Sequence, residues 1–531
     1  MTRASADVDS EVSPPDPARN RRNVMCNVGA FAIQTAVGLW FTPYLITSLG
    51  VGLYGLVPLA TNITSYMGVL TIAISGTIGR FVTINLAKGD VTGARRAFNT
   101  SLVASAVLAF ALLPLAAGIS WWSPSLLNVP SGHERDLQLM LFCAFLSFLM
   151  TAVGSNFAVS TFARSRFDVS SAIETSFVVS RTGGAWLLFT YLSPRLWFVG
   201  AATVIAGVVR QIGYWRAWRR LTPALRVQPA LFDRVQLRAV GGMGGWLILT
   251  HMGALLFLQT DLMVLNWTLG VDPAGMYAPL LQLSMLMRGL ASVIANVISP
   301  TVITMWARAD VTGMARVAGR GVKLLGLALA LPIGLACGFG AHLLSAWLGP
   351  EFAGQANLLR LMLFPLCANL AAGALFAIPQ AANRVRWPGI VTLVLGIAQV
   401  ALAITLVTTT GLGSAGVALA GAIVLTMKNA IFTPWYCARI LKQPAWTFIA
   451  PMVPSLVAAV AVTGAAYCVA DALGSTRLLP LALAGAGLGL VYAPLCLLLA
   501  FRHSERLAVL RLITGRRDEA GPIDPVDPAV P

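Results

Sequence analysis

Long runs of apolar residues, separated by short polar segments, dominate the chain from residue 25 to residue 500. Each run has about 20 residues or more, which is the length that an α-helix needs to cross about 30 Å of hydrocarbon. We expect fourteen membrane spans, at residues 25–48, 55–80, 98–121, 137–162, 169–192, 197–215, 242–268, 275–300, 322–347, 356–381, 388–409, 415–436, 447–470 and 478–500. The pattern therefore predicts an all-α, multi-pass membrane protein.

Basic residues are concentrated in every second connecting segment. Of the 37 Lys and Arg residues, only Arg135, Arg195 and Arg477 lie in the alternate loops, and six more lie within spans. Loops rich in Lys and Arg stay in the cytoplasm, so we expect an inner (plasma) membrane protein with both termini cytoplasmic. This topology accounts for the net charge of +17, and no nucleic-acid partner is expected.

The two halves of the chain carry the same short motifs in register. Gly-Leu-Tyr at 52–54 opens the second span, and Asp-Val-Thr-Gly at 90–93 follows it. Gly-Met-Tyr at 275–277 and Asp-Val-Thr-Gly at 310–313 take the equivalent places around the eighth span. Corresponding spans run in the same direction, which indicates a parallel repeat of six-helix units.

The repeat predicts two lobes and additional segments. We expect a cytoplasmic tail at 1–22, an N-lobe at 23–215, a cytoplasmic linker at 216–240, a C-lobe at 241–437, two further spans within 438–501 and a cytoplasmic tail at 502–531. A short amphipathic surface helix is expected near 503–512, because its Arg residues alternate with apolar ones.

Several basic residues lie inside the apolar runs, where a charge costs at least about 2.5–3.5 kcal/mol at the bilayer centre. Arg181, Arg288 and Lys428 fall near the midpoints of their spans, and Arg80 ends the second span on the cytoplasmic side. These residues either form interhelical ion pairs or line a cavity. Since they outnumber the intramembrane acids, we expect a cationic cavity that binds an anionic substrate.

The intramembrane acids are Glu174 in the fifth span and Asp261 in the seventh. Each has two interpretations: a structural partner for a basic residue, or the carrier of a coupling proton or sodium ion. No other cofactor is expected.

The chain offers little that would support catalysis. The longest predicted outer loop, 122–136, is short, and no phosphate-binding loop or Ser-His-Asp order stands out. The seven cysteines lie in or beside spans without metal-ligand spacing, so no metal site is expected. We therefore expect a transporter and not an enzyme.

The motifs around the first, second, seventh and ninth spans together resemble those of polysaccharide flippases. They are Leu-Gly-Val-Gly-Leu-Tyr-Gly-Leu at 49–56, Arg80, Asp261, Leu-Gly at 269–270, Ala-Gly-Met-Tyr-Ala at 274–278 and Leu-Gly-Pro-Glu-Phe at 348–352. On these motifs the chain resembles the polysaccharide transporter (Wzx-type O-antigen and exopolysaccharide flippase) branch of the multidrug/oligosaccharidyl-lipid/polysaccharide exporter superfamily.

That resemblance implies alternating access between two lobes, an undecaprenyl-diphosphate-linked oligosaccharide as substrate, and the glycosyltransferases and polymerase or ligase of a surface-polysaccharide pathway as partners. Three alternatives stay open. A lipid II flippase or a multidrug exporter would share the fold. A polysaccharide polymerase or ligase would be an enzyme, which the short outer loops disfavour.

Overall fold

The computed structural model describes residues 17–444, 446–474 and 477–500, which form helices joined by short connections, with no strand among them. The long helices are α1 (Pro17–Leu49), α2 (Val51–Ala87), α3 (Val91–Leu126), α4 (Glu134–Ala163), α5 (Phe167–Tyr191), α6 (Leu196–Leu221), α7 (Arg234–Gln259), α9 (Val271–Ala307), α10 (Val311–Gly338), α15 (Arg386–Thr410), α16 (Ser414–Thr426), α19 (Val453–Leu473) and α20 (Leu478–Ala500). Shorter helices complete or join them: η1 (Pro229–Leu231), α8 (Asp261–Leu269), α11 (Gly340–Leu348), η2 (Pro350–Gln355), α12 (Ala356–Leu363), α13 (Leu366–Ala371), η3 (Ala372–Leu375), α14 (Ala377–Ala381), the π-helical turn η4 (Met427–Phe432), α17 (Thr433–Ile440), α18 (Trp446–Ile449) and η5 (Ala450–Met452).

The helices overlap the predicted spans and confirm an all-α polytopic fold. The ninth span, expected at 322–347, is instead formed by α10 at Val311–Gly338, and the end of the predicted range belongs to α11. Within the described residues, eleven helical stretches are long and apolar enough to cross a membrane, and the bent pair α7 and α8 makes a twelfth. The two other predicted spans correspond to α2 and α5. α5 carries Asp168, Glu174 and Arg181, and these charged residues reduce its apolar character.

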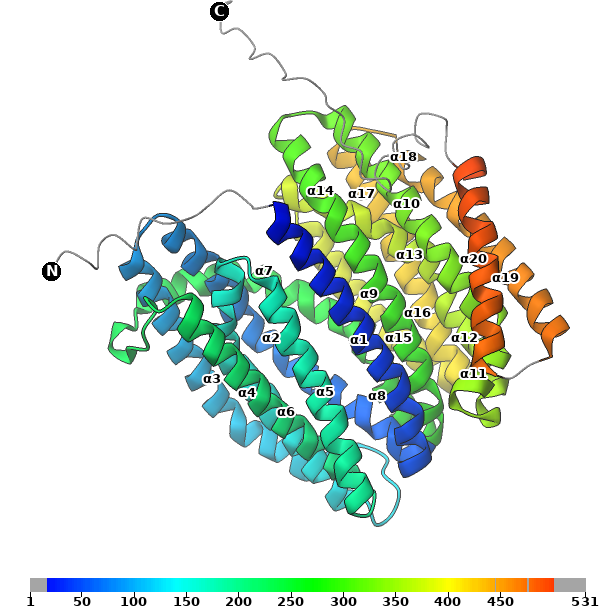
Figure 1. Ribbon diagram of the computed structural model, residues 1–531, viewed down its shortest axis with the longest axis horizontal. Helices are drawn as coiled ribbons and strands as arrows, with labels where there is room; N and C mark the ends of the chain where they lie inside the picture. Colours follow the sequence, from blue (N-terminus) through cyan, green and yellow to red (C-terminus); the bar gives the residue numbers. More distant parts are fainter. Residues whose placement is uncertain (1–16, 445, 475–476, 501–531) are drawn as a thin grey trace, which may run out of the picture.

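The helices form two groups that lie side by side (Figure 1). In the first group α4 packs on α3 and α6, while α5 packs on α6 and α1. In the second group α10 packs on α9, α13 and α19, and α15 packs on α7 and α16. α2 joins the groups, since it contacts α3 and α4 on one side and α7 and α9 on the other.

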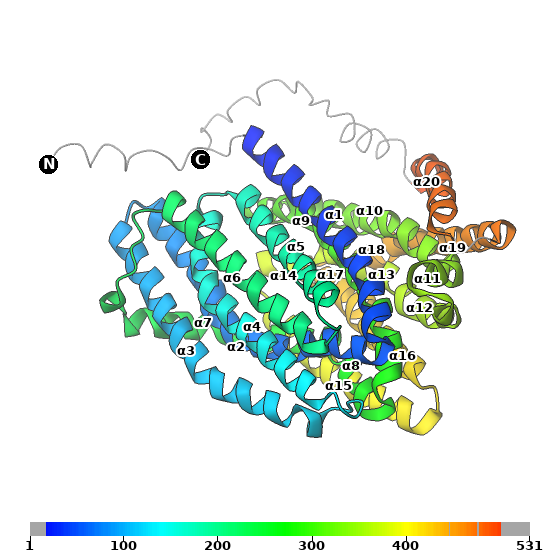
Figure 2. The same ribbon diagram turned by 60° about the horizontal axis from the view of Figure 1, so that its bottom comes forward.

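α1 begins and α20 ends at the same face of the molecule, as Figures 1 and 2 both show. That face also carries the connections 88–90, 164–166 and 222–233, which contain Lys88, Arg164, Arg166 and Arg226. We call it the basic face, and the other end of the helices the opposite face. A chain whose first helix begins and whose last helix ends at the same face crosses the membrane an even number of times, as the sequence predicts.

The repeated motifs have the same local structure in both halves. Asp90 caps the N-terminus of α3 by accepting a hydrogen bond from the Gly93 N–H at 2.8 Å, and Asp310 caps α10 from the Gly313 N–H at 2.8 Å. Capping of this kind satisfies a backbone donor that the first helical turn leaves free. Gly270 (φ +92°) ends α8 in the left-handed region, as Gly50 does for α1. The sequence repeat is therefore also a repeat of helix boundaries.

The two helices that follow these glycines cross in direct contact. A Cβ atom built on Gly55 of α2 would lie 2.8 Å from the Gly275 Cα, and one built on Gly275 of α9 would lie 2.1 Å from the Val51 carbonyl oxygen. Only glycine permits so close an approach of two backbones. The crossing holds the two halves together near the opposite face.

Further hydrogen bonds between the halves lie at the same level. Trp347 Nε1 of α11 donates to the Leu39 carbonyl of α1 at 2.7 Å, and the Asn128 N–H donates to Asn266 Oδ1 of α8 at 2.9 Å. Trp267 Nε1 donates to the Leu126 carbonyl of α3 at 2.8 Å. These bonds join the two groups of helices near the opposite face.

The connection between α6 and α7 is held on the first group of helices. The Arg95 Nε donates to the Ala224 carbonyl at 2.6 Å, and Asn99 accepts from the Gln228 N–H at 2.6 Å. Thr100 Oγ1 accepts from the Asp233 N–H at 3.0 Å. Only 222–233 of the predicted linker 216–240 lies between α6 and α7, because these two helices extend into it at both ends, and this part contains η1.

α1 also extends further than expected, because residues 17–22 of the predicted tail are helical. Pro17 is the first residue of the helix, a position where proline loses no hydrogen bond. The amphipathic helix predicted near 503–512 lies outside the described residues, as do residues 1–16 of the predicted tail.

Candidate functional site: a cationic cavity beside a helix break

The seventh predicted span is broken at Thr260, where α7 and α8 meet at an angle of 48°. A break leaves backbone carbonyls without their helical partners. Side chains of other helices supply partners here: Asn62 Nδ2 of α2 donates to the Gln259 carbonyl at 3.1 Å, and the Tyr66 and Thr260 hydroxyls lie 2.5 Å apart. The break is thus fixed by polar contacts from the first half of the chain.

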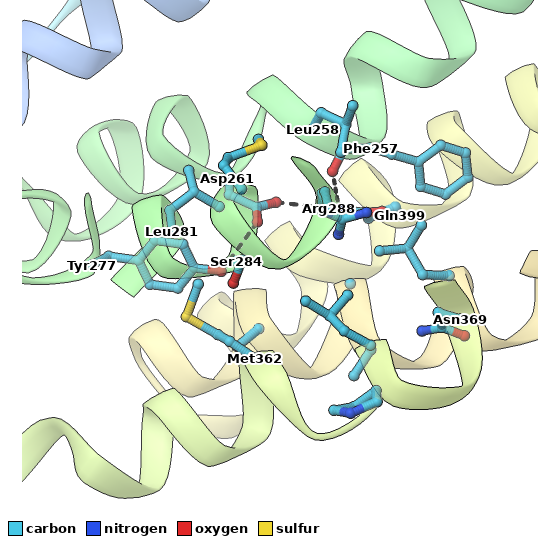
Figure 3. Close-up of a pocket in the computed structure, with 17 residues that line it drawn as sticks. Phe257, Leu258, Asp261, Tyr277, Leu281, Ser284, Arg288, Met362, Asn369 and Gln399 are labelled. Carbon is cyan, nitrogen blue, oxygen red and sulfur yellow. Dashed lines mark hydrogen bonds between the residues drawn. The ribbon is translucent and has the colours of Figure 1, made fainter. Parts of the chain in front are cut away.

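Asp261 is the first residue after the break and lies among polar side chains of α9 and α15 (Figure 3). Its carboxylate accepts a hydrogen bond from the Tyr277 hydroxyl at 3.1 Å and another from Gln399 Nε2 at 3.2 Å. Gln399 also donates to the Phe257 carbonyl at 3.5 Å. These bonds orient Asp261 toward a small cavity of about 40 Å³ that Ser284, Asn369 and Arg288 also line.

Two buried amide oxygens beside this cavity have no hydrogen-bond donor. They are Gln399 Oε1 and Asn369 Oδ1, and both residues are only 1% exposed. An unpaired buried acceptor is costly, and oxygen atoms around a carboxylate are the ligands that hard cations bind. The group of Asp261, Gln399 and Asn369 is therefore suited to hold a proton, a water molecule or a small cation. No cluster of three or more His, Cys, Asp or Glu residues that could bind a metal occurs in the described part of the chain.

A larger cavity of about 540 Å³ begins at Arg288 and extends toward the basic face. It lies between α7, α9, α13, α14 and η4. Its polar lining consists of Arg288, Ser292, Asn296, Ser299, Asn369, Gln380, Thr392, Lys428 and Asn429, and it contains no carboxylate. Two of the four predicted cavity cations, Arg288 and Lys428, thus line one cavity.

Lys428 reaches this cavity from η4, a π-helical turn within the twelfth predicted span. Its Nζ donates to Asn429 Oδ1 at 3.1 Å and lies 5.5 Å from the centre of the Phe376 ring and 5.8 Å from that of Phe257. π-Helical turns occur frequently at functional sites, since they interrupt the regular hydrogen bonding of a helix. Aromatic faces stabilise the ammonium group without neutralising its charge.

Arg181 lies on α5, in the first group of helices, near Tyr54 of α2. Its Nε is buried without a hydrogen-bond partner. Among the described residues no carboxylate lies within 4.0 Å of the charged nitrogens of Arg181, Arg288 or Lys428. The structure therefore does not neutralise these three cations by ion pairing. The side chain of Arg80 lies outside the described part of the chain.

Glu174 has a basic partner, in contrast to these cations. Its carboxylate lies 3.6 Å from an Arg210 nitrogen and accepts a hydrogen bond from the Tyr214 hydroxyl at 2.7 Å. The Arg210 guanidinium also lies over the Phe177 ring, 4.2 Å from its centre, and donates to the Thr151 hydroxyl. These contacts favour the structural interpretation of Glu174, which joins α5 to α6.

An ion-paired group that the sequence did not indicate joins α1 to α5 at the basic face. Asp168 lies 2.9 Å from Arg166 and 2.9 Å from Arg22. The hydrogen bonds from Arg166, assisted by the Arg22 charge, lower the pKa of the Asp168 carboxyl below its ordinary value despite partial burial. Asn23 adds a hydrogen bond to the Ser165 carbonyl at 2.9 Å. This cluster holds α1 against the beginning of α5, and we call it the α1–α5 clamp.

Comparison with known proteins shows which solved structures have a similar fold. No family profile matches the chain. An inward-facing multidrug resistance MATE family transporter of the MOP superfamily superimposes with a TM-score of 0.65 at 16% identity, over 79% of this chain and 99% of that one. The lipid II flippase MurJ in an inward closed conformation gives a TM-score of 0.65 at 11% identity, over 93% and 100%.

The helix arrangement and the charged cavity thus define a multi-pass membrane protein with the fold of MOP-superfamily transporters. The uncharacterized membrane protein EpsK of Bacillus subtilis (strain 168) is 32% identical over 438 residues, which cover 82% of this chain and 87% of that protein. The chain belongs to the same family as EpsK. The fold expected from the sequence motifs is confirmed, and membership of the exporter superfamily and of its polysaccharide branch stays a prediction.

Proposed function

We propose that this protein is a flippase that carries an undecaprenyl-diphosphate-linked oligosaccharide from the cytoplasmic to the outer leaflet of the plasma membrane. The observation that supports this most directly is the cavity of about 540 Å³, whose lining includes Arg288 and Lys428 and no carboxylate. Buried charges without partners are strongly unfavourable, so such a cavity is best suited to an anionic guest. A lipid diphosphate supplies that charge.

The chemistry of the cavity fits a diphosphate headgroup. A guanidinium group holds phosphate oxygens in a fork of two hydrogen bonds, and an ammonium group adds a compact charge. Asn296, Gln380 and Asn429 offer neutral donors and acceptors on the cavity wall, which suit hydroxyl groups of a sugar. The isoprenoid chain can stay in the lipid during the transfer.

The arrangement of the two halves supports alternating access. Their contacts at Gly55 and Gly275 close the opposite face, while the cavity lies in the half of the bundle nearer the basic face. With the basic face in the cytoplasm, as the distribution of Lys and Arg predicts, this state would receive its substrate from the cytoplasmic leaflet. Movement of one lobe against the other would then open the opposite face.

Asp261 is the better candidate for ion coupling, because it lies beside unpaired amide oxygens and within electrostatic reach of Arg288. Loading of a proton or sodium ion at Asp261 would change the charge that Arg288 experiences and therefore the affinity for an anion. Glu174 is occupied by Arg210 and Tyr214. Coupling would thus be placed in the second half of the chain.

The proposed function is tested in a deletion strain. Spheroplasts that lack the protein should accumulate complete lipid-linked glycan units that an impermeant glycan-cleaving enzyme cannot reach until the membrane is opened. The physical reason is that a diphosphate headgroup does not cross hydrocarbon at a useful rate without a polar path.

Rescue with variants identifies the cavity as the cause. Wild-type protein and Arg219→Ala, which removes a surface arginine outside the cavity, should restore outer-leaflet exposure, whereas Arg288→Ala should not. Accumulated units that are cleaved in intact spheroplasts would instead indicate a polymerase or ligase. Accumulation of lipid II in place of a polysaccharide precursor would assign the protein to peptidoglycan synthesis.

A further inference from the structure

A second charged cavity lies at the basic face, between the beginning of α15 and α17. Its volume is about 750 Å³. Its lining includes Arg384, Arg386, Trp387, Phe432, Trp435 and Arg439. None of them lines the cavity of about 540 Å³ at Arg288 and Lys428, which we call the central cavity. We call it the interface pocket.

The interface pocket is basic. Three arginines contribute to it, and its lining contains no Asp or Glu. Elsewhere on the same face Arg166 forms an ion pair with the carboxylate of Asp168. The absence of a carboxylate from the lining is therefore a feature of this pocket and not of the whole face. A pocket with three guanidinium groups and no carboxylate is complementary to phosphate oxygens.

Exposed apolar side chains continue from the pocket along both of its walls. Along α15 the exposed side chains toward its far end are Val394, Ile397 and Ile404, and along α16 and η4 they are Ile423, Met427 and Ile431. These two apolar stripes end at the pocket, where Trp387 is 60% exposed. Aliphatic side chains followed by tryptophan and then arginine reproduce the order of acyl chain, interface and headgroup in a membrane leaflet.

The pocket is held in shape by contacts within its own walls. The Tyr436 hydroxyl donates to the Arg384 carbonyl at 3.0 Å, which ties α17 to the loop before α15. Phe432 stacks on Tyr436 with ring centres 5.5 Å apart, and the Arg439 guanidinium lies 5.6 Å from the centre of the Trp435 ring. The arginines are therefore presented on a preformed aromatic wall.

We infer that the interface pocket binds the phosphate headgroup of an anionic phospholipid in the leaflet next to the basic face. The acyl chains of this lipid would lie along the apolar stripes of α15 and α16. Charge complementarity and the continuity of the pocket with a membrane-facing apolar surface carry this assignment. It does not depend on the identity of the transported molecule.

The interface pocket and the central cavity share one structural element. One π-helical turn, η4, contributes Phe432 to the interface pocket and Lys428 to the central cavity. Occupation of the pocket would stabilise the wall that presents Lys428. The bound phospholipid is therefore a structural ligand that supports the transport site from the membrane side.

The test compares two lipids with identical acyl chains on the purified full-length protein. Phosphatidylglycerol and phosphatidylcholine are titrated separately and the bound lipid is quantified by native mass spectrometry. The double variant Arg384→Gln/Arg439→Gln should lose affinity for phosphatidylglycerol by about fivefold for each arginine removed, while its weak binding of phosphatidylcholine should not change. Arg219→Gln is the matched control, because Arg219 also stacks on a tryptophan of the basic face, at 4.6 Å from the Trp215 ring centre, but does not line the interface pocket.

A second measurement needs no variant. A photo-crosslinkable phosphatidylglycerol added to the wild-type protein should label peptides within 383–391 or 432–440. Equal loss of affinity in Arg219→Gln, or labelling confined to other segments, would overturn the assignment. Displacement of phosphatidylglycerol from these peptides by substoichiometric undecaprenyl diphosphate would also overturn it, since the pocket would then be a loading site for the transported lipid.

Discussion

Substitution of Gly275 by alanine should open the opposite face of the molecule. The new Cβ would lie 2.1 Å from the Val51 carbonyl oxygen, whereas ordinary contacts of a Cβ begin at about 3.4 Å. α2 and α9 must therefore separate by about an ångström, and both partners are backbone atoms that cannot rotate away. Overpacking of this kind costs about 1–3 kcal/mol. Because the cost falls on the closed crossing alone, the closed state should lose about 5- to 150-fold in population relative to the open one.

The assay is the accessibility of a cysteine at position 296, which lines the central cavity. In right-side-out vesicles an impermeant thiol reagent should label this cysteine slowly in the parent protein and faster after Gly275→Ala. Gly183→Ala is the control, because a Cβ on Gly183 meets no atom within 4 Å and should only gain helix propensity of about 1 kcal/mol. Unchanged labelling in a well-expressed Gly275→Ala protein would refute the idea that the glycine crossing keeps this face closed.

Other predictions concern charged groups. Arg288→Ala and Lys428→Ala should each lower flipping at least tenfold at normal protein abundance, and Arg288→Lys should restore only part of it because it keeps the charge without the fork of hydrogen bonds; normal flipping by both alanine variants, measured in proteoliposomes, would remove the binding role of the cavity. Asp261→Asn should make flipping insensitive to proton and sodium gradients, whereas Glu174→Gln should leave gradient dependence intact and lower thermal stability by about 1–3 kcal/mol; the reverse result would exchange their roles. Because the pKa of Asp168 is lowered in the folded protein, its ion pairs stabilise the fold above the ordinary carboxyl pKa, and this contribution is lost as the pH falls through the lowered value. Asp168→Asn should therefore reduce the melting temperature at pH 7 and remove that part of the acid sensitivity, and an unchanged stability profile would contradict the clamp.

The spans and the repeat could be predicted from the sequence because their physical causes are local. A run of 20 apolar residues predicts a helix wherever it packs, and the Asp-Val-Thr-Gly motif contains both the capping carboxylate of Asp90 and the backbone donor of Gly93. The midplane positions of Arg288 and Lys428 were likewise visible as charges in apolar runs, and the structure brings both to one cavity.

The polar environment of Asp261 could not be predicted in the same way. Gln399 and Asn369 belong to other helices, and a single amide in an apolar span carries no sign of which helix it will face. The break at Thr260 lies in the polar triplet Gln259-Thr260-Asp261, which was expected to lie within one continuous span. The contacts that fix the break come from Asn62 and Tyr66 in the other half of the chain. The signal that was available is the presence of buried amides in apolar runs, since an amide in hydrocarbon requires a partner.

The attachment of segment 222–233 to α3 restricts how the molecule can move. A segment that is hydrogen-bonded to Asn99 and Thr100 along its length cannot serve as the joint between two moving bodies. The beginning of α7 must then travel with the first group of helices, while its far end packs on α15 in the second. The two ends of α7 are consequently attached to different groups of helices. A relative movement of the groups would change the bend at Thr260, one residue before Asp261. A change of charge on the Asp261 carboxylate would therefore act directly beside the bend that has to change.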